Sequence, residues 1–186
     1  MGLHPIILDT DPGVDDALAI IYALNHPDLQ VHAITTVCGN IGIDQATKNT
    51  QIILSLLDDT VPLAIGQNQP IYYPLQTASH VHGPDGLGNV SGQFESLEGQ
   101  VAKESAVELI LDSVAKFPDQ LRLICIGPLT NIAQAILANL PLMQRTKEII
   151  LMGGVFERRG NVTTSAEFNI YVDPHAAQIV LESGVP

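Results

Sequence analysis

The chain has 186 residues, enough for one domain with a sizeable buried core. Hydrophobic residues make up 46% of the chain and charged residues only 15%, a balance that suits an α/β enzyme with buried parallel strands. The formal net charge of −12 argues against nucleic acid or an anionic membrane as a partner, because phosphate groups are bound by basic surfaces.

Strand and helix patterns alternate from the start of the chain. Strands are predicted at residues 5–9, 30–37, 62–65, 121–126 and 148–152. Helices are predicted at 12–26, 44–57, 101–117, from 127 onward and at 174–183, with irregular stretches at 66–99 and 155–168. The alternation predicts one α/β domain over residues 1–186, with an open, mostly parallel sheet flanked by helices on both faces.

Targeting segments and cysteines add little to this picture. No stretch combines a basic segment with an apolar core near the first residue, and no apolar run approaches membrane-spanning length, so we expect a cytoplasmic protein. Cys38 and Cys125 lie in apolar, strand-like runs and lack metal-ligand spacing. We therefore expect two buried, reduced thiols.

The most informative stretch follows the first predicted strand. Four carboxylates, those of Asp9, Asp11, Asp15 and Asp16, occur within eight residues around a Pro-Gly turn. Asp9 and Asp11 end the strand, whereas Asp15 and Asp16 fall in the first helical turn, so all four can converge at the tip of the sheet.

Two interpretations of this cluster compete. Aspartate at a helix start accepts orphan backbone N–H groups and suits the positive end of the helix dipole, which accounts for one or two carboxylates. Four so close together repel one another unless a cation neutralises them. An oxygen-rich site without a Cys or His pair favours a hard cation such as Ca²⁺ or Mg²⁺, and we take a metal site as the leading interpretation.

The sequence DTDPGVDDA at residues 9–17 resembles the N-terminal signature of the nucleoside hydrolases, including the inosine-uridine preferring type. Further segments resemble the same family in the expected order: CGN at 38–40, IGPLTN at 126–131, LMGG at 151–154, GNV at 160–162 and AEFN at 166–169. The resemblance extends over essentially the whole chain.

The resemblance implies Ca²⁺-dependent hydrolysis of the N-glycosidic bond of ribonucleosides. The side chains of Asp11 and Asp16 and the carbonyl of Ile126 would bind the calcium ion, which accepts backbone oxygens readily. Asp11 would also act as the general base on a metal-held water. Asp9 would instead hold the turn through hydrogen bonds.

The resemblance also implies a polar shell around the nucleoside. Contacts to the sugar hydroxyls that tighten as an oxocarbenium-like sugar forms would lower the barrier. Asp15, Asn40 and Asn169 would hold ribose hydroxyls, Asn161 and Glu167 would hold the 5′-hydroxyl, Met152 would pack near the 5′ side, and His82 would lie in a loop near the base.

Members of this family continue well past residue 186, where a further calcium-ligating Asp and an adjacent His occur. We therefore expect the chain to be the N-terminal part of such a hydrolase, with a fold that is truncated at its C-terminus. The resemblance further suggests a homodimer or homotetramer.

Two alternatives stay open. Asp9 and Asp11 also form a DxD pair typical of haloacid-dehalogenase-like phosphatases, although Asp15, Asp16 and the AEFN segment have no role there. The chain could instead be a nucleoside-binding remnant that retains the ribose pocket without the missing catalytic groups.

Overall fold

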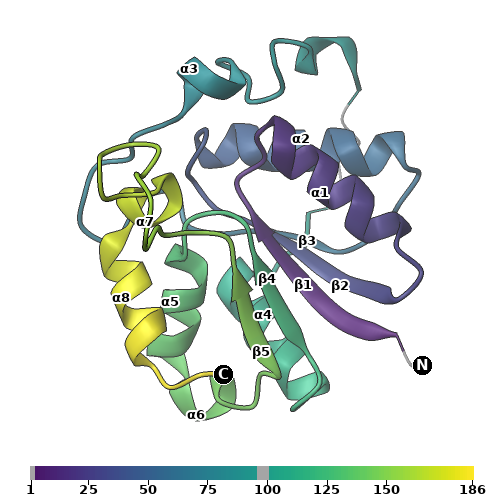
Figure 1. Ribbon diagram of the computed structural model, residues 1–186. Coiled ribbons are helices and arrows are strands. Elements are labelled where there is room, and N and C mark those ends of the chain that lie inside the picture. Colours follow the sequence, from purple (N-terminus) through teal and green to yellow (C-terminus); the bar gives the residue numbers. More distant parts are fainter. Residues whose placement is uncertain (1–2, 96–100) are drawn as a thin grey trace.

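The computed structural model describes residues 3–95 and 101–186. Within these ranges, five parallel strands form one sheet in the order β3-β2-β1-β4-β5 (Figure 1). The strands are β1 (His4–Thr10), β2 (Leu29–Thr36), β3 (Leu63–Ile65), β4 (Arg122–Cys125) and β5 (Glu148–Leu151). The predicted open parallel α/β sheet is confirmed.

Helices cover both faces of this sheet (Figure 1). They are α1 (Val14–Asn25), α2 (Ile43–Leu56), α3 (Ser79–His82), α4 (Ala106–Lys116), α5 (Thr130–Ala138), α6 (Leu140–Met143), α7 (Phe168–Val172) and α8 (Pro174–Glu182), with a 3₁₀ turn η1 at Ser91–Gln93. None of the helices in the described ranges is both long and apolar enough to span a bilayer.

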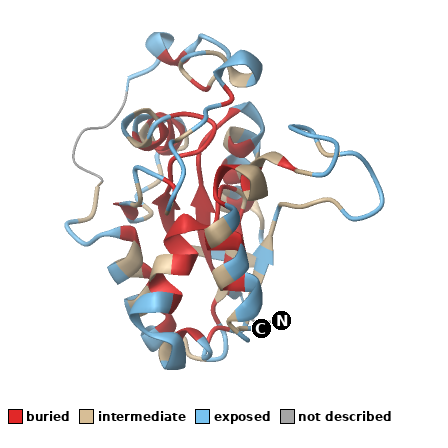
Figure 2. Cartoon of the chain, turned by 90° about the vertical axis from the view of Figure 1, so that its left-hand side faces the viewer, coloured by how far each residue is buried: buried red, intermediate tan, exposed pale blue. Residues whose placement is uncertain are grey.

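Alternation along the central strand β1 creates two hydrophobic cores. Ile7 points into the core shared with α4, α5 and α8, and its neighbour Leu8 points into the core shared with α1 and α2. Buried residues accordingly fill the layers on both sides of the sheet (Figure 2). Because β1 is buried on both faces, its residues 6–8 form a continuous apolar run and not an alternating pattern.

Local capping corrects three predicted helix starts. The helix predicted from residue 101 begins at Ala106, because Ser105 accepts the N–H of Glu108 and the Glu108 carboxylate accepts the N–H of Ser105. Val101 instead forms a parallel bridge with Leu63. The first helix begins after an N-cap at Gly13, not at Pro12, and the second after an N-cap at Gly42.

The stretch predicted as irregular at 66–99 contains α3 and η1, and its residues 96–99 lie outside the described ranges. The stretch predicted as irregular at 155–168 is irregular up to Glu167, and the short helix α7 begins at the next residue, Phe168. Cys38 and Cys125 are buried free thiols, as predicted.

Candidate functional site

A cavity of about 260 Å³ lies at the edge where the carboxyl ends of the parallel strands meet. Open parallel sheets bind their ligands at this edge. The predicted site residues that line the cavity are Asp15, Asp16, Asn40, His82, Ile126, Met152, Asn161, Glu167 and Asn169. Nine residues that are up to 154 positions apart in sequence are therefore brought together, and Asp11 lies directly behind Asn40.

Asp9 serves the turn and not the cavity. Its Oδ1 accepts hydrogen bonds from the Thr35 hydroxyl and, at 2.7 Å, from the Asn131 amide. Complete burial raises the pKa of Asp9 to about 6, against the lowering effect of those two donors. This arrangement agrees with a structural role.

Asp11 is completely buried and only half satisfied. Its Oδ2 accepts the backbone N–H of Asn40 at 2.6 Å, whereas Oδ1 has no hydrogen-bond partner in the described part of the chain. Burial, and then the charge of Asp16, raise the pKa of the Asp11 carboxyl well above its usual value. Oδ2 of Asp9 is also buried without a partner in the described part of the chain, but Asp11 lies next to the second carboxylate, Asp16, and a cation would stabilise that pair.

Two glycines make room for this carboxylate. A Cβ at Gly39 would lie 2.0 Å from Asp11 Oδ2, and one at Gly127 would lie 2.8 Å from Oδ1. Both glycines directly follow apolar segments that end at the sheet edge, so the space that Asp11 needs explains the glycines of CGN and IGPLTN.

Asp16 combines both interpretations of the acidic cluster. As the third residue of α1 it accepts the N–H of Gly13 at 3.0 Å, which is the capping role. It also accepts the Thr10 hydroxyl at 2.9 Å and the Asn40 side-chain amide at 3.2 Å. Asn40 thus bonds to Asp11 through its backbone and to Asp16 through its side chain, which places the two carboxylates side by side.

The oxygens at this point fit a hard divalent cation. The Ile126 carbonyl lies beyond the end of β4 and accepts the Asn169 side-chain amide at 2.8 Å, so it faces the cavity instead of a neighbouring strand. Two carboxylates and one carbonyl are ligands that Ca²⁺ prefers. No cluster of three or more His, Cys, Asp or Glu side chains that could hold a metal occurs within residues 3–95 and 101–186.

The opposite wall of the cavity is built by the start of α7. The Glu167 carboxylate caps this helix by accepting the N–H groups of Asn169 and Ile170, and it also accepts the N–H of Gly154 at 3.0 Å. Asn169 additionally donates to the Met152 carbonyl at 3.0 Å. Asn161 lies on the exposed segment that precedes this wall.

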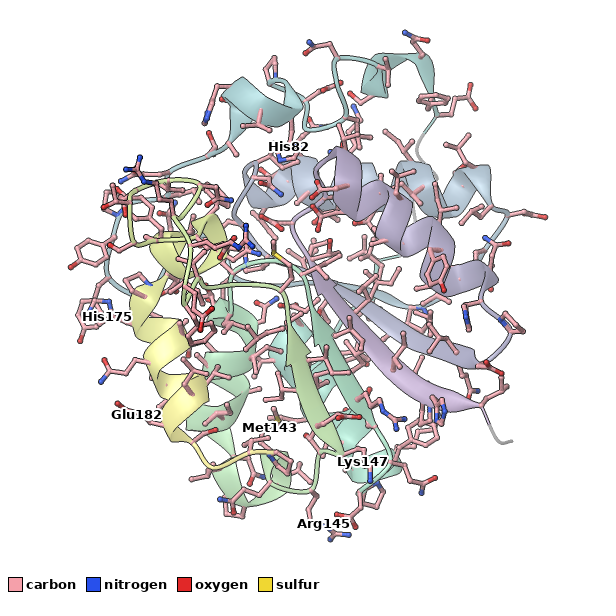
Figure 3. The ribbon with its side chains drawn as sticks, in the orientation of Figure 1. His82, Met143, Arg145, Lys147, His175 and Glu182 are labelled. Carbon is pink, nitrogen blue, oxygen red and sulfur yellow. The ribbon has the colours of Figure 1, made fainter. Side chains whose placement is uncertain are left out.

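His82 lies at the end of α3 (Figure 3) and lines the cavity. Its Nδ1 accepts the backbone N–H of Val14 at 3.3 Å and lies 3.7 Å from the Asp15 carboxylate. Because Nδ1 accepts this N–H, the neutral ring carries its proton on Nε2. His175 lies on the outer side of α8 against Tyr72 and does not line the cavity (Figure 3).

Sequence reasoning missed several residues that line the cavity. His80, Val81 and Phe168 are lining residues with no assigned role. The signal for the first two was present, since the SHVH run at 79–82 precedes a glycine-rich loop, but the four-residue helix α3 that orients them has no periodic pattern.

A larger hollow of about 940 Å³ lies beside the site along β5, α7 and α8. Its lining is mostly apolar, including Leu151, Val155, Ile170 and Leu181, and Glu167 borders both spaces. It does not bring together the several polar groups that mark the smaller cavity.

Residues 6–186 match the sequence pattern of a protein family that is described as "inosine-uridine preferring nucleoside hydrolase". The chain belongs to this nucleoside hydrolase family. The inosine-uridine preferring nucleoside hydrolase of Crithidia fasciculata is 43% identical over 177 residues, covering 94% of this chain and 56% of that protein. The non-specific ribonucleoside hydrolase RihC of Salmonella enteritidis is 42% identical over 184 residues, covering 99% and 59%.

Solved nucleoside hydrolase structures have the same fold. The purine-preferring ribonucleoside hydrolase from Gardnerella vaginalis superposes with a TM-score of 0.93 at 36% identity, covering 98% of this chain and 58% of that structure. The chain therefore spans a little over half the length of the nucleoside hydrolases that it matches.

Proposed function

We propose that the protein hydrolyses the N-glycosidic bond of ribonucleosides, to give ribose and the free base, with the help of Ca²⁺. The observation that carries this proposal is the buried, unpartnered Oδ1 of Asp11 behind a cavity whose other polar groups suit a sugar. Membership of the nucleoside hydrolase family supports the reaction class.

Asp11, Asp16 and the carbonyl of Ile126 would hold the cation. When bound, Ca²⁺ supplies positive charge that keeps both carboxylates ionised and lowers the pKa of a coordinated water. Burial raises the pKa of the Asp11 carboxyl in the metal-free protein, and a bound cation would lower it again, so Asp11 would be an ionised carboxylate when the site is loaded. Asp11 would accept one proton of the attacking water as the water oxygen bonds to the anomeric carbon. The electron pair of the broken bond would leave with the base, which takes up a proton from solvent to become the free base.

The remaining polar groups would recognise the sugar. Asp15, Asn40 and Asn169 would contact ribose hydroxyls, and Asn161 and Glu167 would contact the 5′-hydroxyl beside Met152. These contacts would favour the oxocarbenium-like sugar as it forms. His82, whose Nε2–H is free to donate, would lie near the base.

A phosphatase reaction has less support. Its nucleophile would be Asp9, but one oxygen of that carboxylate accepts hydrogen bonds from both Thr35 and Asn131, and Asp9 does not line the cavity. A nucleoside-binding remnant is the more specific alternative, since Asp11 and Asp16 are the two carboxylate ligands at this point and no cluster of three or more possible metal-binding side chains occurs within the described residues.

The test is ribose release from inosine and uridine, measured with Ca²⁺ and with excess chelator, and phosphate release from p-nitrophenyl phosphate on the same preparation. We expect ribose release that the chelator abolishes. Nucleoside binding without ribose release would support the remnant, and phosphate release alone would overturn both.

A further inference from the structure

The loop after α3 is organised around one carboxylate. Asp85 Oδ1 accepts the N–H groups of Leu87 and Asn89 at 3.0 and 2.8 Å, and its Oδ2 accepts the N–H of Ser91 at 2.9 Å. Burial would raise the pKa of Asp85, but the hydrogen bonds, those of Ser91 and Asn89 foremost, hold it at about 2. Asp85 therefore stays ionised and gathers residues 85–91 into one turn.

A buried amide fastens this turn to the aspartate-rich segment. Asn49, inside α2, donates from Nδ2 to the carbonyls of Asp85 at 2.9 Å and Pro12 at 3.1 Å, while Gln45 donates to its Oδ1. The Pro12 carbonyl immediately follows Asp11. One side chain thus joins the loop to the turn that carries the proposed general base.

The fit between loop and turn is close. Gly86 has φ of +76°, and a Cβ there would lie 2.9 Å from the Asn49 amide nitrogen and 3.0 Å from the Pro12 carbonyl oxygen. A side chain at position 86 would push the two segments apart as well as strain the backbone.

His82 is held by this arrangement. The N–H of Gly88 donates to the His82 carbonyl at 2.8 Å, so the Asp85 turn folds back on α3. On its other side the imidazole packs against Gly13, where a Cβ would lie 2.8 Å from Nδ1, and Nδ1 accepts the N–H of Val14. The position of the ring and its Nε2–H tautomer both depend on the distance between loop and turn.

We propose that Asp85 and Asn49 are positioning residues that fasten the 83–91 loop to the aspartate turn and thereby hold His82, with its proton on Nε2, over the nucleoside cavity. This inference rests on the proposed function for its substrate class. Neither residue lines the cavity, so neither would contact the nucleoside directly.

The kinetic test compares Asp85→Asn with Asp59→Asn in the purified protein with Ca²⁺, using inosine and uridine. The asparagine side chain at position 85 keeps one acceptor oxygen, but its NH₂ group replaces the other oxygen and cannot accept a hydrogen bond from the backbone N–H groups on that side. Asp59 is a matched control, because it also accepts the N–H of a residue two positions on, Val61, in a loop between α2 and β3.

We expect Asp85→Asn to lower kcat/KM by about ten- to a hundredfold, the cost of misplacing a contact by about an ångström, with Asp59→Asn near wild type. The loss must disappear in a His82→Ala background, where there is no imidazole left to position. A loss of equal size in that background, or no loss in Asp85→Asn, would overturn the proposal. Ser91→Ala, which removes only a hydroxyl contact to Asp85, should give a smaller loss in the same direction.

A second readout does not depend on turnover. Nitrogen-15 NMR of labelled histidine reports which ring nitrogen of His82 carries the proton. We expect the Nε2–H form in the wild type and a mixture of tautomers in Asp85→Asn, whereas an unchanged signal contradicts the proposal. If the wild-type protein releases no ribose, the proposed function fails, while this measurement still decides whether Asp85 positions His82.

Discussion

The aspartate turn at residues 9–16 and the segment at 155–166 both contribute to the cavity, but their surroundings differ. Asp9, Asp11 and Asp16 are buried, and so are the groups that donate hydrogen bonds to them, which come from the turn itself (Thr10) and from neighbouring segments (Thr35 and the backbone of Asn40). In the later segment residues 156–159 and 161–165 are exposed, and Phe156 is fully so. Its internal hydrogen bonds are few and long, such as the 3.4 Å bond from Gly160 to Thr164.

The difference separates two kinds of cost. In the aspartate turn the carboxylates are removed from water when the chain folds, so their desolvation lowers the free energy of unfolding. A bound cation would offset that loss. In the 155–166 segment the polar groups remain hydrated, and the penalty falls on substrate binding. Substitutions in the turn should therefore change stability and chemistry together, whereas those in the segment should change binding alone.

The largest effect is expected for Asp11→Asn. The amide removes both the proposed base and a charged cation ligand, so ribose release should fall by about a thousandfold or more. The fold should persist, because the Asn side-chain oxygen can still accept the N–H of Asn40. Ribose release and a thermal melt on the same sample provide the measurement.

Calcium makes this prediction sharper. The wild-type melting temperature should rise when Ca²⁺ is added in excess, by an amount that corresponds to about 2.7 kcal/mol at a hundred times the dissociation constant. In Asp11→Asn this rise should be mostly lost. Near-normal turnover, or an undiminished response to Ca²⁺, would remove Asp11 from the proposed mechanism.

The next largest effect is the pH dependence caused by Asp9. The pKa of Asp9 is about 6 in the folded protein and 3.8 for an ordinary aspartate, so the folded state binds this proton more tightly. Asp9 therefore contributes stability below pH 3.8 that is lost as the pH rises through 6. The difference corresponds to about 3 kcal/mol.

Urea unfolding at several pH values in the presence of chelator would measure this contribution. Asp9→Asn keeps an acceptor for Thr35 and Asn131 but does not titrate, so the wild type should lose stability relative to this variant between pH 4 and 7. If the free energy of unfolding of the two proteins changed with pH in the same way, the pH dependence of stability would come from a group other than Asp9.

The fold could be predicted because it depends on local patterns. Apolar runs such as that before Asp9, and helical spacing after Val14, are visible in the sequence and mark the parallel sheet and its helices. The predicted helix starts were wrong where a single capping contact fixes the first residue of the helix, as at Ser105. The helices α3 and α7 are too short to show a helical period of apolar residues in the sequence.

The site residues could be predicted only as a set of motifs. The sequence indicates that Asp11 and Asn40 belong together, but not that the Asn40 N–H leaves one Asp11 oxygen bare, since that depends on how two strand ends meet. Asn49 and Asp85 carry no motif of their own. Their importance lies in bonds between segments about 36 residues apart, which no local pattern reveals.

The smallest effect is expected for Asn161→Ala in the exposed segment. Its side chain is hydrated in the free protein, so the free energy of unfolding should change by less than about 0.5 kcal/mol. The KM for inosine should rise by about five- to tenfold with little change in kcat, because one sugar contact is lost to both substrate and transition state. Thr164→Ala, an exposed substitution in the same segment that does not line the cavity, should leave both constants unchanged. A drop in stability in Asn161→Ala would show that the segment, like the aspartate turn, is held by the groups that bind substrate, and the contrast between the two regions would then be wrong.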